Sequence, residues 1–187
     1  MRISVREGRR QPDLLEERGG ARLAPILRQQ QQAGRTVVFT NGCFDIIHIG
    51  HVRYLSAAKN EGDLLVVGLN SDRSVRLIKG KQRPIIKQGQ RSEILASLQV
   101  VDYVTLFDEP DPLKLIQLLK PTILVKGADW RAADIIGADF VKSRGGRVVR
   151  ERIRRAVTGG AVAGDARAVG ARAAAAAREA EDAAGPE

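Results

Sequence analysis

The sequence predicts an α/β fold, a parallel sheet of about five strands flanked by helices on both faces. Short runs rich in Val, Ile and Leu alternate along the chain with helical segments. The runs are apolar on both faces, as strands covered on two sides are. Polar clusters directly follow three of these runs, at Asn41, Asn70 and Lys126. Because ligands of such sheets collect at the carboxyl ends of the strands, these clusters predict a binding site there.

Each element follows from a local pattern. The predicted strands cover residues 35–40, 63–72, 101–107, 122–127 and 147–149. The predicted helices cover residues 21–32, 51–62, 92–99 and 111–120. Pro25 lies in or near the first turn of the first helix, and Gly62 is the expected C-cap of the second.

The chain divides into three predicted parts. Residues 1–19 form an N-terminal extension, residues 20–150 the folded domain, and residues 151–187 an Ala/Gly/Arg-rich tail. Of the last 32 residues, 23 are Ala, Gly, Arg or Pro, and none is Leu, Ile or Phe. Such a segment has little to bury, so we expect a frayed helix or a disordered tail.

Composition excludes several classes of protein. No apolar run approaches the ~18 residues of a membrane span, and the N-terminus lacks the apolar segment of a secretory signal. A single cysteine, Cys43, cannot form an internal disulfide. These features predict a cytoplasmic protein that does not enter the membrane.

The net charge of +9 is unevenly distributed. Residues 36–141 carry 13 basic and 12 acidic side chains, so the predicted core is nearly neutral. Residues 1–35 carry 8 basic and 4 acidic side chains, and residues 142–187 carry 10 basic and 6 acidic side chains. The excess therefore lies at the ends, and a nucleic-acid-binding groove in the core is not expected.

Both histidines of the chain lie in one segment, "TNGCFDIIHIGH". The turn Asn41-Gly42 follows the first predicted strand, and a helix begins near Ile49 or Gly50. Backbone amides and the helix dipole favour an anion at such a place. His48 and His51 are one helical turn apart, and Gly50 leaves room between them. Two imidazole donors suit the stabilisation of charge on a phosphate.

Three other interpretations of this segment stay open. A zinc site would need three or four ligands, and only the two histidines, Cys43 and Asp45 are near. A Cys–His nucleophile would lack an evident oxyanion hole beside Phe44. The histidines could also merely cap the helix.

Together the motifs resemble one family. "HIGH" matches the H-x-G-H signature of the nucleotidyltransferases, and "TNGCFDIIHIGH" is similar to its cytidylyltransferase-like branch. With "VVGLNSDRSVRLIKGKQRPI", "QRSEIL", "VVDYV" and "ILVKGADW", residues 20–150 resemble D-glycero-β-D-manno-heptose 1-phosphate adenylyltransferases. In many bacteria that activity forms the C-terminal half of a bifunctional kinase–adenylyltransferase, and no kinase half is present in this sequence.

The resemblance implies a Rossmann-like fold and the transfer of AMP from ATP to a sugar 1-phosphate, with release of pyrophosphate. Mg²⁺ is expected, held mainly by the phosphates. A homodimer is plausible by family. The residues implied in catalysis are His48, His51 and Lys79. The residues implied in ligand binding are Thr40, Asn41, Gly42, Phe44, Asp45, Gly50, Asn70, Asp72, Lys81, Arg83, Arg91, Lys126, Gly127 and Asp129.

Several of these residues also fit structural roles. Phe44 would suit the core, Asn70 to Asp72 a turn and helix N-cap, and Arg91 a salt bridge. Lys79 and Lys81 would suit a solvated loop. Trp130 would either stack on a base or cover the sheet edge.

The sequence departs from the family after Arg150. The family continues into a Gly-x-Ser-Thr-Thr-like loop that binds the ATP phosphates, whereas Thr158 is the only hydroxyl side chain here after Ser143. We hypothesise a frameshift near residue 151, which translation of the other two reading frames would test. The alternatives to the leading function are a cytidylyltransferase acting on glycerol phosphate or a phospho-alcohol, and a catalytically impaired nucleotide-binding homologue.

Overall fold

The computed structural model describes residues 13–15 and 19–151, and the structural statements below concern this part of the chain. Its strands form one sheet in the order β1-β4-β3-β2-β5-β6, and every neighbouring pair is parallel. The strands are β1 (Asp13–Leu15), β2 (Val37–Gly42), β3 (Leu64–Asn70), β4 (Tyr103–Phe107), β5 (Ile123–Gly127) and β6 (Arg147–Glu151). The predicted parallel α/β fold is confirmed.

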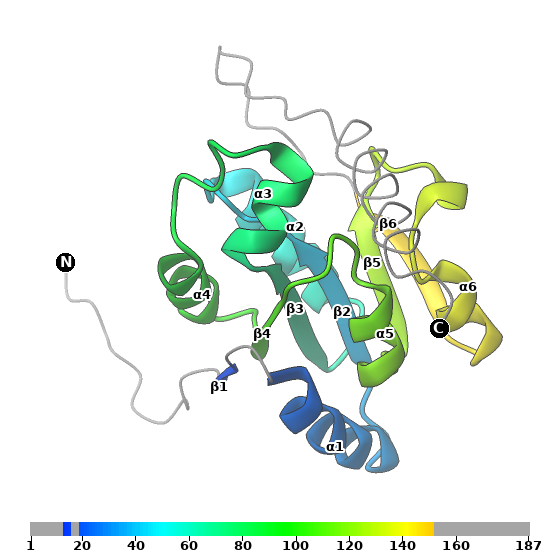
Figure 1. The fold of residues 1–187 in the computed structure, drawn as a ribbon. Coiled ribbons are helices and arrows are strands. Elements are labelled where there is room, and N and C mark those ends of the chain that lie inside the picture. The colour runs from blue at the N-terminus through cyan, green and yellow to red at the C-terminus, as the bar shows by residue number, and fades with distance from the viewer. Residues whose placement is uncertain (1–12, 16–18, 152–187) are drawn as a thin grey trace, which may run out of the picture.

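Helices cover both faces of the sheet (Figure 1). They are α1 (Gly19–Gln32), α2 (Ile49–Lys59), α3 (Asp72–Lys79), α4 (Gln88–Ala96), α5 (Leu113–Leu119) and α6 (Ala138–Ser143), with a 3₁₀ turn η1 (Ala132–Asp134). One core lies between the sheet and α1, α5 and α6, and the other between the sheet and α2 and α4. The molecule therefore has three layers.

Alternate side chains of each central strand enter opposite cores. In β2, Val37 and Phe39 pack with α1 and α5, whereas Val38 packs with α2. This follows from the two-residue period of a strand. All seven residues of β3 are buried, which explains its unbroken apolar sequence.

The order of the strands reverses at β2. From β2 the chain moves through β3 to β4 on one side, and β5 and β6 lie on the other side. In open parallel sheets a crevice forms at such a switch point, outside the carboxyl ends of the strands. In this sheet the switch point lies between β2 and β5.

Most strand ends differ from the prediction by one or two residues, and two differences are informative. β2 continues through Gly42, because Asn41 and Gly42 still align with Gly68 and Leu69 of β3. The turn therefore begins at Cys43 and not at Asn41-Gly42. In addition, β1 lies in the predicted N-terminal extension and pairs with β4.

The helices also differ from the prediction. α1 begins at Gly19, so Pro25 lies inside the helix. The C-cap of α2 is Asn60 and not Gly62. A Cβ at Gly62 would lie 2.9 Å from the carbonyl oxygen of Thr36, so close packing accounts for this glycine.

Three more helices depart from the predicted pattern. α4 begins and ends earlier than residues 92–99. α3 was anticipated only as the helix that Asn70 to Asp72 would cap, and α6 was not predicted. α3 is only eight residues long, and it buries only Ser74, Val75 and Ile78, so its apolar pattern is short. The predicted tail, residues 151–187, lies outside the described residues except for Glu151, which ends β6.

Candidate functional site

The two histidines cap the N-terminus of α2 reciprocally. The Nδ1 atom of His48 accepts a hydrogen bond from the backbone N–H of Gly50 at 3.0 Å. The Nδ1 atom of His51 accepts one from the backbone N–H of His48 at 3.4 Å. A neutral imidazole that accepts at Nδ1 carries its proton on Nε2. Both rings are therefore Nε2–H donors, and their centroids lie only 4.1 Å apart.

The environment of His51 keeps this ring neutral. Burial, and then the charges of His48 and Lys79, lower the pKa of His51 to about 4. The edge of the ring faces Phe44 at 5.4 Å between centroids. Within the described residues, neither histidine Nε2 has a hydrogen-bond partner. The helix-capping interpretation is thus correct for the Nδ1 atoms and leaves the Nε2 donors available.

Asp45 holds the loop between β2 and α2 in place. It is 5% exposed, and its carboxylate accepts from Arg83 at 2.7 Å and from the amides of Ile85 and Ile86 at 2.7 and 3.1 Å. Burial acts to raise the pKa of this carboxyl, but these hydrogen bonds outweigh it and lower the pKa. The loop also contains Phe44 in the left-handed region, at φ 44°. Arg83 therefore pairs with Asp45 and braces the loop.

Arg91 is fully buried behind the same loop. Its guanidinium donates to the carbonyl oxygens of Cys43 at 2.6 Å and Asn70 at 2.9 Å, and to that of Ile86 at 2.9 Å. It also pairs with the carboxylate of Asp72 at 2.8 Å. This geometry favours the structural alternative for Arg91.

The segment after β3 is likewise held by internal bonds. Ser71 caps α3 by accepting from the amide of Ser74 at 3.1 Å, as the structural alternative predicts. Asn70 is buried and donates to the Ser74 hydroxyl at 2.8 Å. Asp72 also accepts from the amide of Gln88 at 2.8 Å. Asn70 and Asp72 therefore have internal partners.

A basic segment lies beside the histidines. Residues 73–92 contain seven Arg or Lys and no Asp or Glu. Lys79, half-buried at the end of α3, lies close enough for its charge to lower the pKa of His51. Lys81 is exposed in the following turn. Lys79 therefore belongs to the histidine cluster, whereas Lys81 lies on the surface.

The end of β5 contributes a buried lysine. Lys126 is 6% exposed and donates to the side-chain oxygen of Asn41 at 2.5 Å, while its Nζ lies 5.2 Å from the centroid of the Trp130 ring. Burial lowers the pKa of Lys126 to about 8. Gly127 is buried, and Asp129 is exposed in the next turn.

Thr40 faces the interior. Its hydroxyl bonds the Tyr54 hydroxyl at 2.7 Å, and Tyr54 donates to the carbonyl oxygen of Val125 at 3.2 Å. Burial raises the pKa of Tyr54. These two hydrogen bonds link α2, β2 and β5 beneath the strand ends. Tyr54 was not predicted, and its position one turn after His51 was the only signal.

The structure thus sorts the predicted residues by position. Those at the ends of β2, β5 and α3 and the start of α2 come together: Asn41, Gly42, Phe44, Asp45, His48, Gly50, His51, Lys79, Lys126 and Gly127. Thr40, Asn70, Asp72, Arg83 and Arg91 are tied into internal bonds around them. Lys81 and Asp129 lie at the surface.

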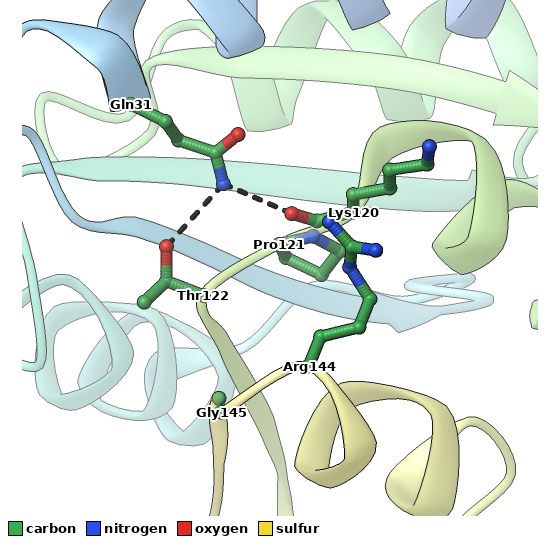
Figure 2. A pocket seen from close by; sticks show the side chains of 7 residues that line it. Gln31, Lys120, Pro121, Thr122, Arg144 and Gly145 are labelled. Carbon is green, nitrogen blue, oxygen red and sulfur yellow. Dashed lines mark hydrogen bonds between the residues drawn. The ribbon is translucent and has the colours of Figure 1, made fainter.

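A shallow pocket lies at the opposite, amino edge of the sheet (Figure 2). It is lined by Gln31, Lys120, Pro121, Thr122, Arg144, Gly145 and Gly146. The Gln31 amide donates to the carbonyl oxygen of Lys120 and the hydroxyl of Thr122, at 2.9 and 3.3 Å. These bonds tie α1 to the start of β5, far from the strand ends that carry the histidines and Lys126.

Metal-ligating side chains do not cluster in the described part of the chain. No group of three or more His, Cys, Asp or Glu residues there could hold a metal ion. Asp45 and Asp72 are occupied by Arg83, Arg91 and backbone amides. In addition, no helix within residues 19–151 has the length and apolarity needed to cross a bilayer.

Comparison with known proteins agrees with this geometry. Residues 39–158 match the family model described as cytidylyltransferase-like. The chain belongs to this family. It therefore falls in the nucleotidyltransferase class, and the matched region includes both histidines and Lys126.

The most similar relatives include bifunctional proteins HldE. The chain is 54% identical to that of Geobacter metallireducens over 126 residues, which cover 67% of this chain and 26% of the relative. It is 55% identical to that of Campylobacter fetus over 116 residues, which cover 62% of this chain and 25% of the relative. The chain thus spans 26% or less of the length of these two relatives. The predicted resemblance to the adenylyltransferase half of the bifunctional heptose kinase/adenylyltransferases is confirmed.

A solved structure gives the same result. The lipopolysaccharide core biosynthesis protein from Thermoplasma volcanium is 34% identical, with a TM-score of 0.55. The match covers 63% of this chain and 96% of that protein. A protein made almost entirely of the matched region therefore adopts this fold.

Proposed function

We propose that this domain transfers AMP from ATP to heptose 1-phosphate, giving ADP-heptose and pyrophosphate for a lipopolysaccharide or another heptose-containing glycan. Membership of the cytidylyltransferase-like family and the similarity to HldE support the reaction. The similarity to a lipopolysaccharide core biosynthesis protein supports the use of the product.

The observation that carries the proposal is the pair of Nε2–H donors at the start of α2. In the reaction, an oxygen of the sugar phosphate attacks the α-phosphorus of ATP, and the bond to the bridging oxygen of pyrophosphate breaks. Negative charge therefore moves onto the leaving pyrophosphate. Fixed donors at a helix N-terminus stabilise such charge without rearrangement. We assign this role to His48 and His51, aided by the ammonium of Lys79.

Because His51 is neutral, it acts by donating a hydrogen bond and not by general acid catalysis. The reaction needs no covalent enzyme intermediate, so alignment of the two phosphates is the other main requirement. We assign the remaining ligand contacts to Asn41, Gly42, Phe44, Gly50 and Gly127. Asp45 and Arg83 act by fixing the loop, and Lys81 by closing over the phosphates.

ATP enters this scheme as its magnesium complex. Mg²⁺ in proteins retains waters and binds substrate phosphates readily, so it needs few protein ligands. No residue of this chain is therefore assigned to the metal.

The test of the activity is pyrophosphate release from ATP and heptose 1-phosphate, compared with CTP and glycerol phosphate. We expect release with the first pair and at most a small fraction of that rate with the second. Equal rates would contradict the proposed substrate. No release with either pair, from protein that still binds ATP, would contradict the proposed enzyme and favour an impaired homologue.

The test of the histidines separates their two functions. His48→Asn and His51→Asn place an amide oxygen near the position of Nδ1, where it accepts the capping bonds, and leave no donor at the position of Nε2. We expect each to lower kcat by about 100-fold with little change in melting temperature. His48→Ala and His51→Ala lose both functions, so we expect the same loss of kcat with an added loss of about 1 kcal/mol of stability. Near-normal turnover in the two Asn variants would overturn the assigned role.

A further inference from the structure

Lys126 is a buried cation without a counter-charge. Among the described residues no carboxylate lies within ion-pair distance of its Nζ, which contacts the amide oxygen of Asn41 and the face of the Trp130 ring. An ammonium group has three N–H donors, and Asn41 uses one of them. Burying a charge without an opposite charge destabilises a protein. Such an arrangement is typical of a binding site for an anion.

The position of Lys126 supports this interpretation. Its hydrogen bond to Asn41 spans the ends of β5 and β2, which are the two strands at the switch point of the sheet. Ligands of open parallel sheets bind in the crevice at this point. The ammonium of Lys126 therefore lies at the switch point, between the ends of β5 and β2.

The two lysines of the site lie on opposite sides of β2. Lys79 ends α3, which follows β3, and its charge acts on His51. Lys126 ends β5, on the other side of β2. An in-line displacement requires the attacking and leaving groups on opposite sides of the phosphorus. If the pyrophosphate leaves toward the imidazoles and Lys79, the attacking phosphate must come from the side of Lys126.

We propose that Lys126 binds the phosphate of the acceptor, and that Asn41 holds its ammonium in place until the acceptor arrives. This inference rests on the proposed function, and it assigns the two substrates to the two sides of the β2 end. The depressed pKa of Lys126 agrees with a buried cation that gains its counter-charge only when the acceptor phosphate binds.

The experiment measures the KM of each substrate in the wild type and in Lys126→Met. Methionine keeps much of the length of the side chain and removes its charge. We expect the KM for heptose 1-phosphate to rise at least tenfold and the KM for ATP to change less than twofold. We also expect an equal or higher melting temperature, because an unpaired buried charge is removed. Lys59→Met is the matched control, since Lys59 is paired with Asp102 at the other edge of the sheet.

Two results would overturn the inference. A raised KM for ATP with an unchanged KM for the acceptor would place the nucleotide at Lys126. A lower melting temperature with both KM values unchanged would make Lys126 a structural link between β2 and β5. If the wild type releases no pyrophosphate, calorimetric titration with heptose 1-phosphate still decides: binding that Lys126→Met abolishes supports the site, and binding that it retains overturns it.

The pH dependence of the wild type gives an independent measurement. The KM for heptose 1-phosphate should rise as the pH increases through about 8, where Lys126 loses its proton. Cys43 and Asp129 are the titratable groups that act on it, and burial raises the pKa of Cys43. The same rise in Cys43→Ala would therefore confirm Lys126 as the source. A KM that stays flat to pH 9.5 would contradict the inference.

Discussion

Arg91 and Lys126 are both buried cations at the carboxyl edge of the sheet, on opposite sides of the end of β2. Arg91 donates to three backbone carbonyls and pairs with Asp72. Lys126 bonds one amide and faces one ring, with no carboxylate beside it among the described residues. The difference teaches that burial alone does not mark a functional charge. A cation whose donors are satisfied by the fold stabilises it, whereas a cation short of partners is available to a ligand.

The largest expected effect on stability comes from Arg91→Met. The change leaves the carbonyl oxygens of Cys43 and Asn70 without the hydrogen-bond donor Arg91, and it leaves Asp72 without its cation. Breaking a buried pair in this way costs about 3–5 kcal/mol, and we expect a loss of that size in urea denaturation. The comparison requires Lys126→Met to show no such loss. A small loss of stability in Arg91→Met together with a raised KM for ATP would show instead that Arg91 is a ligand.

Arg91 also shows where prediction from sequence ends. Its partners Cys43, Asn70 and Asp72 lie 48, 21 and 19 residues away along the chain. The bond between Lys126 and Asn41 spans 85 residues. No local pattern records such contacts, so sequence could assign both residues to the site but could not separate a structural cation from an available one.

The histidine segment was predictable because its geometry is local. His48, Gly50 and His51 lie within one helical turn, and the helix begins at Ile49, one of the two residues near which its start was predicted. The reciprocal capping bonds through Nδ1 could not be predicted from the sequence, because they depend on how both imidazole rings are rotated. The parallel sheet was predictable from its apolar runs. α3 was not assigned because it is only eight residues long, and so few positions give little apolar periodicity to recognise.

The neutral state of His51 predicts a stability that depends on pH. In the unfolded chain its pKa is near 6.5, and in the folded protein it is about 4. Between these values the unfolded state binds a proton that the folded state does not, so stability falls as the pH drops from 6.5 toward 4. We expect the urea midpoint of the wild type to fall more between pH 7 and pH 5 than that of His51→Gln.

Asp45 supplies the internal control for this measurement. Because its folded pKa is lowered below the usual 3.8, its contribution is fully present above pH 4 and is lost only as the pH falls further. The interval between pH 5 and 7 therefore reports on histidine and not on Asp45. Parallel curves for the wild type and His51→Gln across this interval would show that His51 is not held neutral by the fold.

The smallest expected effect comes from Lys59→Met, which tests the comparison at the surface. Lys59 pairs with Asp102 at 2.5 Å, and both side chains are partly exposed. When the lysine is removed, the carboxylate of Asp102 still accepts a hydrogen bond from the backbone amide of Leu65 at 2.7 Å, so it keeps a partner. Exposed pairs contribute about 0–1 kcal/mol, and we expect a loss in this range that shrinks further at 1 M salt. A loss above about 2 kcal/mol would mean that this partly exposed pair stabilises the fold as much as a buried pair does. That result would contradict the comparison. A loss within the expected range, together with the larger loss in Arg91→Met, would support the comparison. The contribution of a paired cation to stability in this fold would then depend on how many buried partners lose a hydrogen bond when the cation is removed.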